Sequence, residues 1–318
     1  MKIISHKRRF LIYASCLIIP AVVFTEMTLN NTKKIYLENV LKGLDTLASI
    51  QKFRVQEMIY GNYQRVLGVT SRTALRKDLY SYIKMGDAAK LPSIKKILAD
   101  AQKPFLDIEE IFIYDSEGHV IVSTGVSGDF KGSLNAGVLK KIKDRLSIWP
   151  YQVSQNSVEL LLTGPILYND KPIAFLGIIV DDKSIRRIAE DVSGLGESGE
   201  TVLSKKNERG DAELMHPRRH ASYLQSMADI PQNQIEVAMI QALLRYEGTL
   251  SNATDYRGEP VFAATRYIVE EDWGIVVKMD QKEVLGPIVQ VRHSAYKLLF
   301  IVLIFWLIVG FLCMQLKI

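Results

Sequence analysis

The sequence predicts an α+β protein, in which a long N-terminal helix carries two antiparallel-sheet units and is flanked by two transmembrane helices. Three observations lead to this prediction. Apolar runs occupy residues 10–25 and 298–314, near the two ends of the chain. The stretch after the first run has apolar residues at helical spacing. Farther along, the period of the apolar residues changes from that of a helix to that of a strand.

The apolar run near the C-terminus is the clearer membrane span. No charged residue occurs from Leu298 until Lys317. At about 1.5 Å per residue, such a helix can cross a hydrocarbon core of about 30 Å. We therefore expect a transmembrane helix at 296–316 and a cytoplasmic end at 317–318.

The first apolar run predicts a transmembrane helix at 10–27. It follows an N-terminal segment, 1–9, that contains four Lys and Arg residues, and segments of this charge stay in the cytoplasm. A cleaved signal peptide is the alternative, although no small-x-small cleavage site follows Phe24. With both spans retained, the region between them lies outside the cytoplasm.

Composition excludes several classes of function. The two cysteines lie in the two spans, so no disulfide framework is expected outside the membrane. The formal net charge of +5 does not indicate nucleic-acid binding, because several cations lie beside the membrane. We find no zinc-finger, Walker or Rossmann pattern and no set of catalytic residues, so neither a cofactor, a metal nor an enzyme is expected in this chain.

Residues 28–75 are expected to form one long helix. No proline occurs between Pro20 and Pro92. An apolar stripe with three- and four-residue spacing runs along the first part of the helix: Leu37, Val40, Leu41, Leu44, Leu47 and Ala48. This stripe can pack on its own domain or pair with the same helix of a second chain. A second amphipathic helix is predicted at 91–101, before Pro104.

The next segments alternate in the manner of strands. Strands are predicted at 110–114 and 119–123 around a turn, and at 158–167 and 172–181 around Asn169–Lys171. A glycine-rich loop at 125–137 and a short helix at 138–146 lie between these pairs. Together the segments predict an antiparallel sheet with helices on one side.

The same pattern then repeats more weakly. Strands are predicted at 200–204, 212–215, 248–252, 260–267 and 273–280, with a helix at 232–244. Within the last strand of each set, a stretch that starts at a glycine, Gly177 or Gly274, runs through apolar residues and ends at an aspartate with a lysine just beyond. We interpret the two sets as two copies of one α+β unit.

Three stretches carry a resemblance to a known family: residues 194–201 (GLGESGET), 255–261 (DYRGEPV) and 273–277 (WGIVV). They resemble the double Cache region, the extracytoplasmic sensor of bacterial transmembrane receptors, over about residues 30–290. The resemblance implies two PAS-like units, a membrane-distal one at 76–190 and a membrane-proximal one at 191–290. It also implies that small ligands bind mostly in the distal unit.

One subfamily of these sensors binds amino acids through an Arg-x-Trp-Tyr element, a later tyrosine and an aspartate at the end of the last distal strand. The corresponding residues here are Arg145, Trp149, Tyr151 and Asp181. The match is incomplete, because Ser147 and Pro150 stand at two of the motif positions and no later tyrosine is found. In the alternative interpretation the two aromatic residues belong to the core, and Asp181 caps the following helix at 183–191. The ligand class stays open between amino acids and carboxylates.

Other polar groups have plainer interpretations. Asp115, Glu117 and His119 could suggest a metal site but fit a solvated hairpin tip. His216 and His220 could belong to an anion-binding patch, could face lipid headgroups, or could lie in an exposed loop. A second pocket in the proximal unit could be formed by a further set, for which turn and edge-strand residues are the favoured interpretation: Tyr256, Arg257, Arg266 and Asp280.

The expected function is small-molecule sensing and transmembrane signal transduction, as the input half of a dimeric two-pass receptor in a bacterial inner (plasma) membrane. The central domain would be periplasmic or extracellular. Among possible outputs we favour a histidine kinase of a two-component system, then a diguanylate cyclase, then a chemoreceptor. The alternative is an envelope-anchored binding protein with no signalling output, and a membrane-tethered hydrolase is disfavoured by the missing catalytic set.

Overall fold

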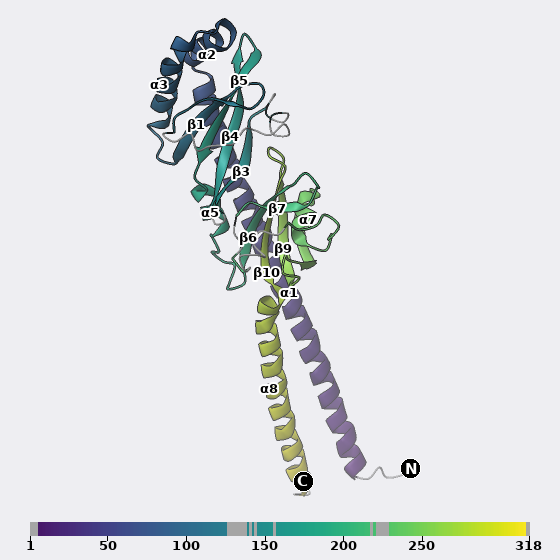
Figure 1. Cartoon of the computed structure of the whole chain (residues 1–318). Helices are drawn as coiled ribbons and strands as arrows, with labels where there is room; N and C mark the ends of the chain where they lie inside the picture. Colours follow the sequence, from purple (N-terminus) through teal and green to yellow (C-terminus); the bar gives the residue numbers. More distant parts are fainter. Residues whose placement is uncertain are drawn as a thin grey trace.

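A single helix organises the molecule. The computed structural model describes residues 6–125, 139, 142, 145–154, 157–216, 219–220 and 229–315. Helix α1 (His6–Thr70) continues without a break through the first apolar run. Its C-terminal part carries one α+β unit, its middle carries a second, and its N-terminal part runs beside α8 (Gln281–Gln315) (Figure 1). The expected long helix is confirmed, and it ends at Thr70.

Two further helices precede the first sheet. Helix α2 (Thr73–Met85) follows α1 directly and ends at Gly86, whose positive φ of 71° suits a glycine. A short 3₁₀ turn, η1 (Ala88–Lys90), leads into α3 (Leu91–Gln102), which was predicted. Helix α2 was not predicted, because the two residues between α1 and α2 include neither glycine nor proline.

The distal sheet is fully antiparallel, with the strand order β2-β1-β5-β4-β3. Its strands are β1 (Ile108–Tyr114), β2 (Val120–Ser123), β3 (Ser147–Ser154), β4 (Ser157–Tyr168) and β5 (Lys171–Val180). Four of them confirm the prediction. Strand β3 was not predicted, because Pro150 lies inside it, and a proline is tolerated there only because β3 is an edge strand.

The proximal sheet repeats this topology, with the order β7-β6-β10-β9-β8. Its strands are β6 (Glu200–Lys206), β7 (Ala212–Leu214), β8 (Gly248–Thr254), β9 (Pro260–Ile268) and β10 (Trp273–Asp280). The matching order confirms the predicted repeat. The helix expected at 232–244 is shorter than predicted, since α7 spans Ala238–Leu243.

Both sheets pack one face against α1. In the distal unit the helix-facing side chains include Ile111, Leu162 and Ile178, which form a core with α1, α2 and α3. The same core continues into the proximal unit through Ile268 and Trp273. Helix α5 (Lys183–Ala189) connects the two units. The two units are therefore joined by a continuous apolar core as well as by the shared helix.

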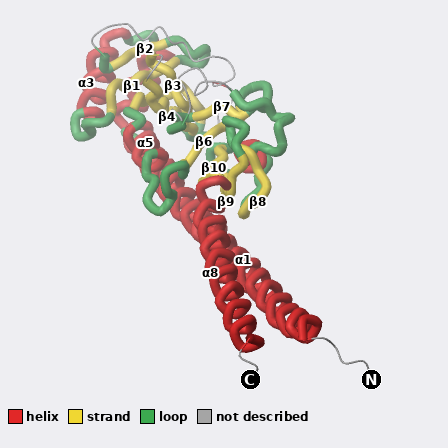
Figure 2. The backbone as a smooth tube through the Cα atoms, turned by 90° about the horizontal axis from the view of Figure 1, so that it is seen from below, coloured by secondary structure: helices red, strands yellow, loops and turns green. Residues whose placement is uncertain are grey.

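Helix α8 begins directly after β10. Within the described residues it is the helix long and apolar enough to cross a membrane, with a mean hydropathy of 2.5. Two views show α1 and α8 side by side below the proximal unit (Figures 1 and 2). Arg292 of α8 lies 3.5 Å from Glu26 of α1. Strand β10 therefore continues into α8 with no intervening residue.

Candidate functional site

The distal sheet has a second face, turned away from α1. Because side chains alternate along a strand, the residues between those of the core point to this face. We call it the distal face. Its side chains form one cluster with the helical residues Leu139 and Ile142: Phe112, Tyr114, Trp149, Leu161, Phe175 and Ile179. Aromatic residues are prominent in it, as they are in pockets for small organic molecules.

A glycine sits under one of these aromatic rings. Gly177 pairs with Phe112 in the β1–β5 register. A Cβ atom at Gly177 would lie 2.6 Å from Cε2 of Tyr114, which is closer than real Cβ contacts allow. Gly177 thus leaves room for Tyr114 to lie flat on the sheet. The Tyr114 and Phe112 rings stack with their centroids 5.9 Å apart.

Two of the four predicted ligand residues lie together. Trp149 is half-buried on β3, opposite Leu161, and Arg145 lies exposed just before that strand. Both line one cavity of about 280 Å³ between the two units. The backbone of Tyr151 pairs with Glu159 in the β3–β4 ladder, but its side chain lies outside the described part.

Asp181 lies apart from this pair. Its carboxylate accepts hydrogen bonds from the backbone N–H of Lys183 at 3.2 Å and from Lys183 Nζ at 2.6 Å. It lines a different cavity, of about 480 Å³, with Arg65 and Asp107. These contacts fit the alternative interpretation, in which Asp181 serves the start of the following helix.

Sequence reasoning missed a buried carboxyl group on β4. Burial, a hydrogen bond with Glu109 and the charges of Glu109, Asp182 and Asp181 raise the pKa of Glu159 to about 7. Glu159 is 8% exposed. A lone acidic residue between Val158 and Leu160 was the signal that could have identified it.

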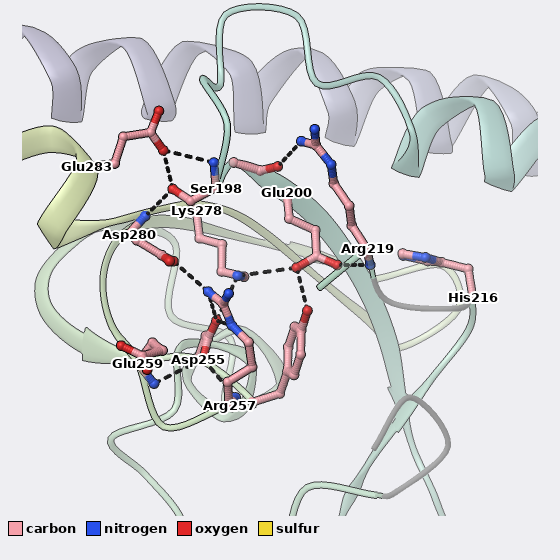
Figure 3. A network of polar contacts seen from close by, with 12 residues as sticks. Ser198, Glu200, His216, Arg219, Asp255, Arg257, Glu259, Lys278, Asp280 and Glu283 are labelled. Atoms are coloured by element: carbon pink, nitrogen blue, oxygen red, sulfur yellow. Dashed lines mark hydrogen bonds and ion pairs between the residues drawn. The ribbon is translucent and has the colours of Figure 1, made fainter. Parts of the chain in front are cut away.

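The equivalent face of the proximal sheet packs partly against α7 and, beside that apolar core, carries a network of buried charged side chains (Figure 3). Lys278, only 1% exposed, lies 2.7 Å from Asp255 and 3.2 Å from Glu200. Burial opposes ionisation of Asp255, but Lys278 and Arg257 hold the pKa of its carboxyl below the usual range. Pairing and hydrogen bonding of this kind are what a buried charge needs.

Three of the four residues predicted to line a second pocket take part in this network. Arg257 bridges Asp255 at 2.7 Å and Asp280 at 2.5 Å. The Tyr256 hydroxyl donates a 2.9 Å hydrogen bond to Glu200. Arg266 does not join them, since it lies on the other face and pairs with Asp45 of α1 at 2.7 Å. The predicted pocket is thus filled by ion pairs.

The network extends to the first turn of α8 (Figure 3). The carboxylate of Glu283 accepts 2.8 Å hydrogen bonds from the backbone N–H groups of Glu197 and Ser198. The Ser198 hydroxyl donates to Glu283 and accepts a 3.0 Å bond from the backbone N–H of Asp280. The segment between the two units is therefore tied to the start of α8.

Asp115 and His216, two of the remaining candidates, have structural roles. Asp115 accepts hydrogen bonds from the backbone N–H groups of Glu117 and His119, which fits the solvated hairpin tip. Within the described ranges no group of three or more His, Cys, Asp or Glu could hold a metal ion. His216 is 7% exposed, and its Nε2 accepts a 3.2 Å bond from the backbone N–H of Leu203. The expectation of an exposed loop is therefore wrong at His216.

Two antiparallel sheets of one topology on a shared helix, the second running straight into an apolar helix, define a sensor region of a membrane receptor. The chain belongs to the Cache domain family, which it matches over residues 25–288. This match confirms the resemblance inferred from the sequence. Cache sensor regions are extracytoplasmic parts of such receptors and are not catalytic. A comparison with curated protein sequences finds no match.

Solved sensor domains share the fold. The sensory domain of the Campylobacter jejuni chemoreceptor Tlp3 is 13% identical, with a TM-score of 0.54 over 80% of this chain and 99% of that one. The Vibrio cholerae histidine kinase DctB sensor domain is 12% identical, with a TM-score of 0.55 over 77% and 98%. The Pseudomonas aeruginosa amino acid chemoreceptor PctC, in complex with GABA, is 12% identical, with a TM-score of 0.51 over 76% and 100%.

Proposed function

We propose that this chain is the input half of a bacterial membrane receptor that binds a small molecule on the distal face and transmits the event through the proximal unit. One contrast carries the proposal. The distal face carries a cluster of aromatic and aliphatic side chains, whereas the equivalent proximal face combines an apolar core against α7 with a group of buried ion pairs. The first arrangement suits a binding site, and the second suits a rigid connection.

The ligand that fits the distal face best is a small amine or amino acid with an apolar body. Trp149 and its neighbours offer apolar area, Arg145 could hold a carboxylate, and Glu159 could receive an ammonium group. Asp181 contributes through its charge near Glu159, since Lys183 already pairs with it. Tyr151 completes the set in this proposal. The relatives are crystallised with L-norvaline and with GABA.

Transmission would run through β10. Ligand binding shifts the populations of two relative arrangements of the units. The change in arrangement is passed to α8 through the hydrogen bonds that Glu283 accepts from the segment between the units. We place the two spans at 10–27 and 296–316, with both ends of the chain in the cytoplasm. The apolar α8 and the neighbouring α1 support this two-pass topology.

For the output we propose a histidine kinase, ahead of a diguanylate cyclase and a chemoreceptor. The receptor would work as a homodimer, because α1 exposes an apolar stripe in the region of the two units: Ile50, Phe53, Tyr60 and Leu67.

The second candidate function, an envelope-anchored binding protein without signalling output, shares the ligand site. It differs in predicting that ligand leaves α8 in place.

A thermal-shift screen of the full chain in lipid nanodiscs tests the proposal, with amino acids, amines, carboxylates and purines as probes. A ligand at 100 times its Kd stabilises a protein by about 2.7 kcal/mol. We expect a hit that is lost in Trp149→Ala and kept in Arg187→Gln, a control on the exposed surface. A spin label on α8 then separates the two candidates. Thermal stabilisation by a ligand with no change in the spin-label signal of α8 favours the envelope-anchored binding protein. The absence of a hit in every class of probe counts against both candidate functions.

A further inference from the structure

The cavity between the two units is formed by both of them. Strand β3 of the distal unit supplies one wall, with Arg145 and Trp149. The β6–β7 turn and the β9–β10 turn of the proximal unit supply the other, with Lys206 and Arg245 nearby. Figure 1 shows the β9–β10 turn reaching up towards β3. Its volume of about 280 Å³ suits a small ligand.

The floor of this inter-unit cavity is fixed. The carboxylate of Glu271, 8% exposed, accepts a 2.5 Å bond from the Tyr63 hydroxyl and a 2.9 Å bond from the backbone N–H of Ile148. These bonds join the β9–β10 turn to α1 and to β3. Trp273, 1% exposed, closes the floor beside them. The walls are therefore held in place before any ligand enters.

Cations outnumber anions around this cavity. Four lining side chains are basic and two are acidic: Arg145, Lys205, Lys206 and Arg245, against Glu271 and Asp272. Burial raises the pKa of Glu271 to about 7, so this carboxyl is only partly ionised at neutral pH. Lys205 pairs with Glu213 at 3.3 Å, and Arg245 pairs loosely with the half-exposed Asp272 at 3.6 Å. Within the described residues Arg145 and Lys206 form no ion pair.

The two cations without an ion pair among the residues described and the loosely paired Arg245 come from opposite sides of the junction. Arg145 belongs to the distal unit, and Lys206 and Arg245 belong to the proximal unit. Like charges that face each other repel, and a shared anion removes the repulsion. Each guanidinium group can donate hydrogen bonds to two oxygens of an oxyanion. Such charge-assisted hydrogen bonds are about twice as strong as hydrogen bonds between neutral groups. The ion pair between Arg245 and Asp272 is exposed and therefore weak, so Arg245 can exchange Asp272 for a bound anion.

We propose that this inter-unit cavity binds a small multivalent oxyanion, such as a phosphate or an oligocarboxylate, between Arg145 of the distal unit and Lys206 and Arg245 of the proximal unit. The cavity adjoins the distal face through Arg145 and Trp149, whereas Lys206 and Arg245 belong to the cavity alone. A bound anion links the two units through its contacts with both, and so it makes movement of one unit relative to the other less favourable. That second statement rests on the proposed signalling function, but the binding itself does not.

Titration calorimetry on the full chain in uncharged nanodiscs tests the site at constant ionic strength. The probes are inorganic phosphate and citrate, with acetate and chloride as monovalent comparators. We expect saturable binding of phosphate or citrate, and the tighter of the two identifies the oxyanion class. The double variant Lys206→Gln/Arg245→Gln, which leaves the proposed distal ligand residues unchanged, should weaken this binding at least tenfold. The charge-conserving Arg145→Lys should keep most of it.

Two controls make the result decisive. Arg187→Gln removes an exposed cation from the other cavity and should leave anion binding unchanged. Gly177→Ala disturbs Tyr114 on the distal face and should also leave it unchanged, while it weakens binding of any distal ligand. Failure of the anion site and failure of the distal site are thus separate outcomes. Equal affinity of the double variant and the native chain, or equal effects of acetate and phosphate, would overturn the proposal.

Discussion

The carboxylate of Glu271 accepts a 2.5 Å hydrogen bond from the hydroxyl of Tyr63, a residue 208 positions earlier in the chain. The same oxygen accepts the backbone N–H of Ile148 at 2.9 Å. One carboxyl group therefore joins α1, the distal β3 and the proximal β9–β10 turn. Because Tyr63 and Glu271 are buried against each other, burial and the neighbouring carboxylate both raise the pKa of Tyr63.

The state of the Glu271 carboxyl should make stability depend on pH. Burial raises its pKa from the ordinary 4.5 to about 7 in the folded chain. A raised pKa contributes stability that is complete below about 4.5 and is lost as pH rises through about 7. We expect Glu271→Gln, which keeps the acceptor oxygen, to remove this loss. At pH 8 it should stabilise the chain by at most about 3 kcal/mol, measured by thermal unfolding between pH 5 and 8.

A neighbouring residue provides the control for that experiment. Glu270 bonds to Gln56 on the exposed surface at 3.0 Å, so Glu270→Gln should keep the native pH profile. Glu159 also has a pKa of about 7 and contributes a slope of the same sign. The decline in stability between pH 5 and 8 should disappear only in Glu271→Gln/Glu159→Gln. A native profile in Glu271→Gln would show that the Glu271 carboxyl does not titrate in this range.

A glycine before β6 should be essential for anchoring α8. Gly196 has a φ of +65°, and a Cβ atom there would lie 2.2 Å from Oε1 of Glu283. Alanine at this position suffers both a left-handed backbone and a collision with Glu283. We expect Gly196→Ala to lower the free energy of unfolding by more than the roughly 1–2 kcal/mol typical of backbone strain alone.

Another left-handed glycine separates the two effects. Gly258 has a φ of +79°, and nothing lies within 4 Å of a Cβ built there. Gly258→Ala should therefore show the backbone strain alone. The difference in denaturant midpoint between the two variants measures the collision at Glu283. Equal losses in both would mean that the start of α8 can move aside freely.

The secondary-structure elements that could be predicted are those that neighbouring residues in the sequence reveal by themselves. Strands β4 and β5 were predicted because their apolar runs and the Asn169–Lys171 turn are visible in the sequence. Strand β3 was missed because Pro150 contradicts a strand unless its place at the sheet edge is known. Helix α2 was missed because the break after Thr70 involves only two ordinary residues.

The candidate sites were less predictable, because their chemistry depends on distant contacts. Arg145 and Trp149 do line one cavity, but the nearest partner of Asp181 is Lys183, two residues away. Glu271 gives no local sign of burial, since its partners lie 123 and 208 residues earlier. Lys278 was detectable in principle, as a charge that continues an apolar strand.

Removing Lys278 should strongly destabilise the proximal unit. Lys278→Met leaves Glu200 and Asp255 buried without their shared cation. Loss of one partner from a buried ion pair typically costs about 3–5 kcal/mol. We expect a loss of that order in chemical denaturation of the full chain. Lys282→Met, an exposed residue four positions later, is the matched control and should change stability little. A small loss in Lys278→Met would mean that water replaces the cation.

The exposed stripe on α1 should hold two copies of the chain together. Phe53 and Tyr60 are 62% and 61% exposed and stand one heptad apart, so they lie on the same side of the helix. Pairing of two such stripes would bury apolar area, and a charge placed there would have to be buried without a partner. Phe53→Glu/Tyr60→Glu should therefore convert a dimer to a monomer in light scattering, with the thermal midpoint of each unit kept. Lys33→Glu, a change at an exposed residue on the opposite side of α1, should leave the dimer intact. A native chain that is monomeric at micromolar concentration, or a double variant that stays dimeric, would move the dimer contact away from this stripe.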